Sequence, residues 1–138
     1  MKRLSPDNIF SLFDKLDEEI LKEEGQEELL KEDYVLLGLA IKGIENYVYL
    51  NEIYSNRYGE KYNAIAEGIK NKYFSKMYSY IDEIQLNKLE DFLGAVESLG
   101  SGTVVVALEE LSLYFVGREE YEKCAKIKKL TDLVKSFF

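Results

Sequence analysis

Apolar residues recur along the chain every three to four positions, which is the spacing of amphipathic helices. The first such stretch begins at Ser5-Pro6-Asp7, because serine is a favoured N-cap and proline fits the first helical position. It ends at Gly25, a typical residue beyond a helix C-terminus. Acidic residues such as Asp14 and Glu18 fall opposite its apolar face, which consists of Ile9, Leu12, Phe13, Leu16 and Ile20. The pattern predicts an amphipathic helix over residues 6–24.

A second apolar segment, residues 27–58, contains a predicted break near Glu32-Asp33 that starts a new helix over about 33–57. One apolar row of this helix comprises Leu37, Ile41, Ile44 and Val48. The adjacent row comprises Leu36, Ala40, Gly43, Tyr47, Leu50 and Tyr54. Two neighbouring rows predict that this is the central, most buried helix. We expect Gly38 and Gly43 to allow close approach of another helix.

Four more helices are predicted between glycine-containing connections. They cover residues 60–81, 86–99, 103–116 and 119–137. Their buried rows are Ile65, Ile69, Tyr73, Met77 and Tyr80; Leu89, Phe92, Leu93 and Val96; Leu108, Leu111 and Phe115; and Tyr121, Cys124, Ile127 or Lys128, Leu130, Val134 and Phe137. The sequence therefore predicts an all-α, single-domain bundle of about six helices, mostly antiparallel neighbours, over residues 1–138.

One predicted helix conflicts with local propensity. Val104-Val105-Val106 favours a strand, whereas the following apolar residues continue with helical spacing. We predict a helix here, with Thr103 as its N-cap.

The net charge of −8 is unevenly distributed along the 138 residues. Residues 1–33 hold 11 acidic and 5 basic side chains, a net charge of −6. An acidic surface repels phosphate backbones, so direct nucleic-acid binding is disfavoured, but the same surface attracts a basic partner.

Several kinds of chemistry lack their usual residues. There is no histidine, and Cys124 is the single cysteine, so we expect neither a catalytic site, a metal site nor a cofactor. Gly100-Ser101-Gly102-Thr103 lacks the Gly-Lys-Ser/Thr ending of a phosphate-binding loop. The longest apolar run, Tyr34 to Ile41, is too short to span a membrane, and nothing near Met1 resembles a signal peptide. We expect a cytoplasmic protein with no membrane association.

Nine of the eleven tyrosines lie between residues 34 and 80. Most of these tyrosines are expected at the edge of the core, where the ring is buried and the hydroxyl remains in contact with water. Tyr49 falls on the polar strip of the helix over 33–57, so it is the strongest candidate for a surface contact, with Tyr58 and Tyr62 next. A short basic window has the residue types that hold single-stranded nucleic acid: Lys70, Lys72 and Lys76 alternate with Tyr73, Phe74 and Tyr78. Three lysines are too few, however, to overcome the negative charge of the whole chain.

The last stretch of the chain follows a recognisable pattern. Ala107-Leu108-Glu109-Glu110-Leu111 is followed by Glu119-Glu120-Tyr121-Glu122-Lys123-Cys124-Ala125-Lys126-Ile127-Lys128. This pattern over about 107–134 resembles the UVR-type helical hairpins of nucleotide-excision-repair and stress-kinase adaptor proteins. Lys129 and Cys124 depart from that family's usual residues, and tetratricopeptide-like hairpins share much of the pattern. The resemblance implies a contact between paired hairpins and no catalytic residue.

Two functions remain after these exclusions. The first is non-catalytic binding of another protein, as an adaptor or regulator, with a homodimer as one form of this binding. The second is inhibition of a nucleic-acid-binding or defence enzyme by an acidic face that mimics nucleic acid; small phage inhibitors such as anti-CRISPR proteins are similar in composition. The candidate partner-binding residues are Asp14, Asp17, Glu18, Tyr49, Tyr58 and Tyr62.

Overall fold

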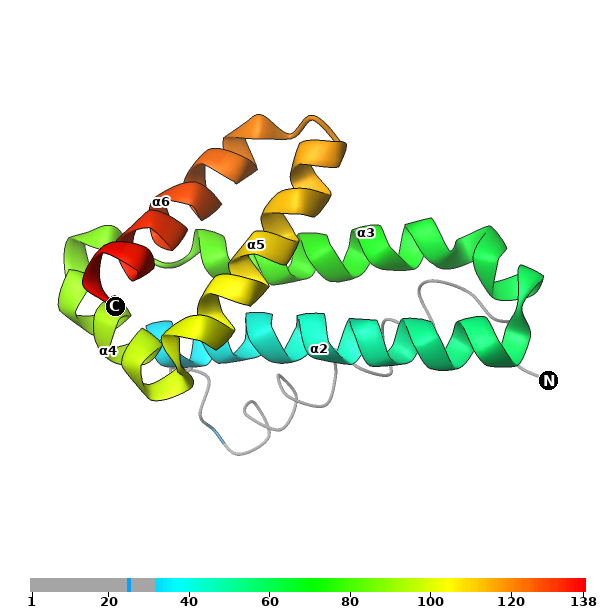
Figure 1. Cartoon of the computed structure of the whole chain (residues 1–138), viewed down its shortest axis with the longest axis horizontal. Coiled ribbons are helices and arrows are strands. Elements are labelled where there is room, and N and C mark those ends of the chain that lie inside the picture. Colours follow the sequence, from blue (N-terminus) through cyan, green and yellow to red (C-terminus); the bar gives the residue numbers. More distant parts are fainter. Residues whose placement is uncertain (1–24, 26–31) are drawn as a thin grey trace.

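The computed structural model describes Gly25 and residues 32–138, and the regular structure in this part of the chain is entirely helical (Figure 1). The helices are α2 (Asp33–Tyr58), α3 (Glu60–Asp82), the 3-10 helix η2 (Leu86–Lys88), α4 (Leu89–Leu99), α5 (Ser101–Gly117) and α6 (Tyr121–Phe137). The all-α prediction is therefore confirmed. The helix predicted over residues 6–24 lies outside the described residues.

Helices α2 and α3 form a long hairpin whose reversal depends on Gly59 (Figure 1). Gly59 has a φ of +53°, which residues with a side chain rarely adopt, and its N–H donates to the carbonyl of Ser55 at 3.0 Å. Midway along the hairpin the side chain of Met77 occupies the space where Gly43 has no Cβ. The prediction of close helix approach is confirmed at Gly43. At Gly38 none of the described helices approaches as closely, because no described atom lies within 4 Å of the position that a Cβ would occupy.

Helices α5 and α6 form a second hairpin, which crosses the first, and α4 links the two (Figure 1). The predicted helix through the valine run is confirmed, but it begins at Ser101 with Gly100 as N-cap, not at Thr103. Between α5 and α6, the N–H groups of Glu119 and Glu120 donate to the carbonyls of Val116 and Phe115. Because Glu119 has a φ of +61° in this turn, α6 begins at Tyr121, two residues later than predicted.

One core joins both hairpins and α4. Helix α2 packs against α3, α4 and α5, as its two predicted apolar rows require. The largest fully buried side chains come from every helix from α2 to α6; they include Leu36, Leu50, Tyr62, Ile69, Phe92, Leu108, Phe115 and Ile127.

Three residues assigned to buried rows are exposed instead. Val48, Tyr121 and Phe137 each keep more than half of their surface accessible. Val48 lies at the edge of the buried side of α2, and Tyr121 and Phe137 lie at the two ends of α6, where the neighbouring helices no longer cover them. A helical period identifies a row of residues but not how far along it the partner helix extends.

Among the described helices, none is by itself long and apolar enough to cross a membrane. The segments Leu86–Leu99 and Ser101–Gly117 are long and apolar enough only when they are taken together, and the chain bends by 104° between them.

Candidate partner-binding surfaces

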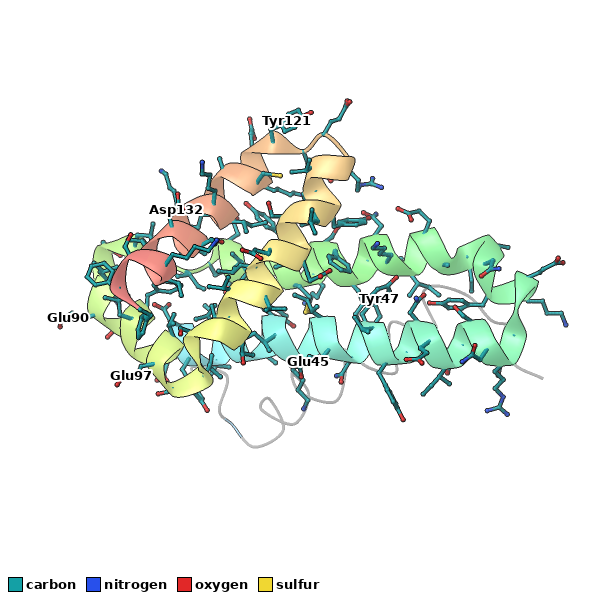
Figure 2. All side chains as sticks on the ribbon, viewed as in Figure 1. Glu45, Tyr47, Glu90, Glu97, Tyr121 and Asp132 are labelled. Atoms are coloured by element: carbon teal, nitrogen blue, oxygen red, sulfur yellow. The ribbon has the colours of Figure 1, made fainter. Side chains whose placement is uncertain are left out.

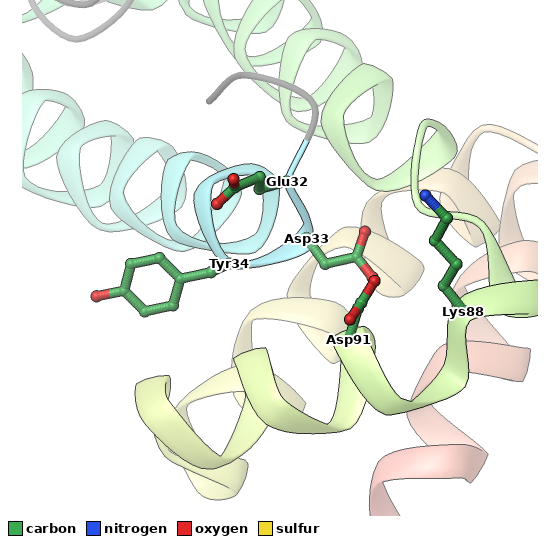
Figure 3. Close-up of a pocket in the computed structure, with 5 residues that line it drawn as sticks. All are labelled: Glu32, Asp33, Tyr34, Lys88 and Asp91. Atoms are coloured by element: carbon green, nitrogen blue, oxygen red, sulfur yellow. The ribbon is translucent and has the colours of Figure 1, made fainter. Parts of the chain in front are cut away.

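An acidic cleft lies where the start of α2 meets α4 (Figure 3). It has a volume of about 490 Å³ and is lined by Glu32, Asp33, Tyr34, Lys88 and Asp91. The carboxylates of Asp33 and Asp91 point toward each other, with Lys88 beside them (Figure 3). A second hollow, lined by Asp82, Glu83 and Gln85, shares Asp33 and Lys88 with the first.

The electrostatics of the cleft centre on Asp33. Its Oδ2 atom is buried and accepts no hydrogen bond from the described residues. Burial, followed by the nearby charge of Asp91, raises the pKa of the Asp33 carboxyl, and Lys88 and Lys126 oppose the shift. No group of three or more His, Cys, Asp or Glu side chains in the described part of the chain could hold a metal ion. The cleft therefore offers a basic partner a negative surface.

The raised pKa predicts a pH-dependent effect of Asp33→Asn. A carboxyl whose pKa is raised by folding stabilises the protein most below its unfolded pKa of about 3.9, and this contribution is lost as pH rises through the folded pKa. Asparagine has a similar shape and no charge. We therefore expect the variant to melt at a higher temperature than wild type at pH 7, with the difference shrinking toward pH 3.5.

Thermal unfolding by circular dichroism at several pH values measures this effect. Asp132→Asn, an exposed change on α6 away from the cleft (Figure 2), is the matched control and should show no such trend. A less stable Asp33→Asn variant at pH 7 would contradict the assignment of Asp33 as a destabilising carboxylate.

The three candidate tyrosines have different surroundings. Tyr49 keeps 67% of its surface exposed on the outer side of α2, as predicted. Tyr58 is half-buried and stacks on Tyr54, with ring centroids 5.4 Å apart. The prediction that Tyr62 contacts a partner is wrong, because its side chain is fully buried and its hydroxyl donates to Oδ1 of Asn51 at 2.8 Å. Burial raises the pKa of the Tyr62 phenol.

The basic window on α3 serves contacts within the fold. Tyr73 and Phe74 lie in the core, and Lys70 Nζ lies 5.7 Å from the ring centroid of Phe74 and 5.5 Å from that of Tyr114. Lys76 Nζ lies over the ring of Tyr80 at 5.3 Å. These cation–aromatic contacts stabilise the packing of charged side chains around the core.

The outer side of α5 carries a row of exposed apolar residues that is not among the surface candidates predicted from the sequence. Val106 and Leu113, two helical turns apart, keep 61% and 68% of their surface exposed, and Val116 follows one turn later. Glu109 and Glu110 lie between them, and Glu109 accepts a 3.1 Å bond from Lys135 of α6. The signal was present in the sequence, because only these two residues of 101–117 are charged and such a helix exposes apolar residues unless it is surrounded.

The remaining candidates are the acidic residues of the N-terminal stretch and the cysteine. Asp14, Asp17 and Glu18 lie outside the described residues, so the nucleic-acid-mimic hypothesis stays a prediction. Cys124, predicted to be a buried structural thiol, is half-buried, and its Sγ lies 3.8 Å from the carbonyl oxygen of Ser112.

Comparison with protein-family models, curated proteins and solved structures found no match for this chain.

Proposed function

We propose that the protein acts without catalysis, by binding another protein through the outer side of α5. The observation that carries this proposal is the exposed row of Val106, Leu113 and Val116. The opposite side of the same helix is fully engaged in the core through Val104, Ala107, Leu108, Leu111, Tyr114 and Phe115. Exposed apolar residues grouped on one surface are typical of interaction sites, whereas scattered ones are not.

The charge around the row indicates the kind of partner. Glu109 and Glu110 are exposed between Val106 and Leu113, and the whole chain has a net charge of −8. A helix that presents apolar residues flanked by lysine or arginine would match both the apolar row and the two carboxylates. We therefore infer that the partner contributes a basic amphipathic helix.

The resemblance to UVR-type hairpins supports the same location. The residues that carry it, about 107–134, fall within the α5–α6 hairpin. That resemblance implies a contact between hairpins, and the exposed apolar row of α5 is the surface that such a contact would use.

Aspartate substitutions in the row test the proposal. The variant Val106→Asp/Leu113→Asp alters only exposed side chains, so it should fold as wild type does. Placing two charges at the centre of an apolar contact should reduce recovery of the bound partner about tenfold or more. The measurement is affinity capture from a lysate of cells that express the protein, quantified by mass spectrometry.

Asn63→Asp is the matched control, because it adds a negative charge at an exposed position on α3 and should leave recovery unchanged. Equal recovery with the α5 variant and wild type would refute the proposed surface. Light scattering covers the homodimer expected from the sequence: if the partner is a second copy, wild type has twice the mass of the α5 variant.

A further inference from the structure

The end of the α5–α6 hairpin next to its turn carries an apolar patch that crosses from one helix to the other. On α5, Leu113 and Val116 keep 68% and 48% of their surface exposed. On α6, the first residue, Tyr121, keeps 63% of its surface exposed. Figure 2 shows Tyr121 at the start of α6, beside the turn that joins the two helices. We call Leu113, Val116 and Tyr121 the hairpin patch.

The packing of α6 on α5 places these three side chains together. Cys124 Sγ lies 3.8 Å from the carbonyl oxygen of Ser112, which fixes the register of the two helices. Val116 lies one helical turn after Ser112 on the same side of α5. Tyr121 lies one turn before Cys124, so it is level with Val116. The hairpin patch therefore lies over the seam between α5 and α6, with Leu113 on its outer edge and the half-buried Cys124 thiol at its floor.

Charged residues limit the hairpin patch on the side away from the turn. Glu109 of α5 and Lys128 of α6 lie beyond it, and both are exposed. Glu109 accepts a 3.1 Å bond from Lys135, and Glu110 is exposed one turn from Leu113. A helix that covers the patch therefore meets a carboxylate on the α5 side and an ammonium group on the α6 side. Its own basic residues match only the α5 side.

We propose that the basic helix of the partner docks across the seam between α5 and α6, with Tyr121 as its main anchor and its basic residues on the α5 side, near Glu110. This inference rests on the proposed function, in which the outer side of α5 binds such a helix, and it extends that surface to α6. Tyrosine is among the residues that most often carry the binding energy of an interface. Because Tyr121 is mostly exposed in the folded chain, binding can still bury its ring.

A synthetic peptide tests the proposal directly. The probe is an amphipathic peptide of leucine and lysine, about 18 residues long so that it can form a helix, with one tryptophan on its apolar side. The protein contains no tryptophan, so the emission reports only on the peptide. Binding to wild type should shift the emission to the blue, and Tyr121→Ala should raise the Kd about tenfold, as expected for an anchor residue. Tyr49→Ala is the matched control, because Tyr49 is exposed to a similar extent on α2 and its replacement should leave the Kd unchanged.

The single cysteine supplies a second readout, because it lies at the floor of the hairpin patch. With the peptide at ten times its Kd, about nine-tenths of the protein is occupied, so the reaction of Cys124 with Ellman's reagent should slow about tenfold. A peptide in which glutamate replaces lysine should neither bind nor protect Cys124, since its charges oppose those of α5.

The outcomes separate this proposal from the proposed function. Equal affinities of Tyr121→Ala and wild type, or a Cys124 reaction that the peptide does not slow, would overturn docking across the seam. If Val106→Asp/Leu113→Asp abolishes binding in the same titration, the α5 surface of the proposed function still stands; if that variant also binds as wild type does, both proposals fail. Equal binding of the glutamate peptide would overturn the assignment of a basic partner. A Cys124 reaction that slows as the protein concentration rises, without peptide, would assign the patch to a second copy and would also overturn the proposal.

Discussion

Replacing Tyr114 by alanine should lower the free energy of unfolding by about 3–5 kcal/mol, as expected for removal of a buried aromatic side chain. Tyr114 links α5 to α3: its ring lies 4.7 Å from that of Phe74, and its hydroxyl donates to Oδ1 of Asn71 at 3.0 Å. Burial raises the pKa of the phenol, although Arg118 opposes the shift, so the hydroxyl stays a hydrogen-bond donor at neutral pH. Lys70 and Arg118 lie over the same ring, at 5.5 and 5.7 Å from its centroid.

Urea unfolding followed by circular dichroism measures this loss, and two variants separate its causes. Tyr114→Phe removes only the hydroxyl, so it should cost about 0.5–1.5 kcal/mol. Leu113→Ala, next to it on the exposed side of α5, should stay within about 0.5 kcal/mol of wild type. If Tyr114→Phe is as destabilising as Tyr114→Ala, the ring contacts do not hold α5 on α3. The outcome also bears on function, because Tyr114 fixes the helix whose opposite side carries the proposed partner-binding row.

Local patterns were enough to predict the helices that the structure describes. The start of α2 at Asp33 followed from the break at Glu32-Asp33, and the reversal at Gly59 followed from its glycine. The valine run in α5 is helical against its own propensity, because Leu108, Leu111 and Phe115 are buried together only in a helix. Periodicity summed over a long segment thus outweighed the preference of three residues.

Burial at the edges of these rows depends on how the hairpins cross, which a single helical period does not contain. Tyr62 was predicted to lie on a surface, but it lies in the first turn of α3, where the ring of Tyr54 in α2 stacks on its ring with the centroids 6.0 Å apart. Phe137 was assigned to the core, but α6 extends beyond the helices that would cover its last turn.

The candidate surfaces were predictable only where one helix defines them. Tyr49 was identified correctly as exposed, since its position on the polar strip of α2 is a local property. The pairing of Asp33 with Asp91 brings together residues from α2 and α4, so no spacing in the sequence indicates it. Because α5 has only two charges, both a surrounded helix and one with an exposed apolar row fit its sequence, and its packing decides between them.

Replacing Gly43 by alanine should destabilise the protein by about 1–2 kcal/mol, even though alanine is the better helix former. A Cβ at this position would overlap Sδ of Met77 and lie 2.6 Å from its Cε, and Met77 is buried. Overpacking of this kind costs about 1–3 kcal/mol, and the gain in helix propensity offsets up to about 1 kcal/mol of it. Urea unfolding of Gly43→Ala, Met77→Ala and the double variant measures the coupling. The double variant should be more stable than the sum of the two single changes predicts, by about 0.5–3 kcal/mol.

Gly38→Ala supplies the control from the same helix. Among the described residues, no atom lies within 4 Å of the Cβ that it adds, so the difference in helix propensity should stabilise the variant by up to about 1 kcal/mol. Two glycines five residues apart in α2 are thus expected to respond with opposite signs to the same substitution. If Gly43→Ala is as stabilising as Gly38→Ala, Met77 moves aside without cost, and the close approach of α2 and α3 does not require glycine. If both substitutions destabilise, the difference in helix propensity between glycine and alanine does not decide the response at either position.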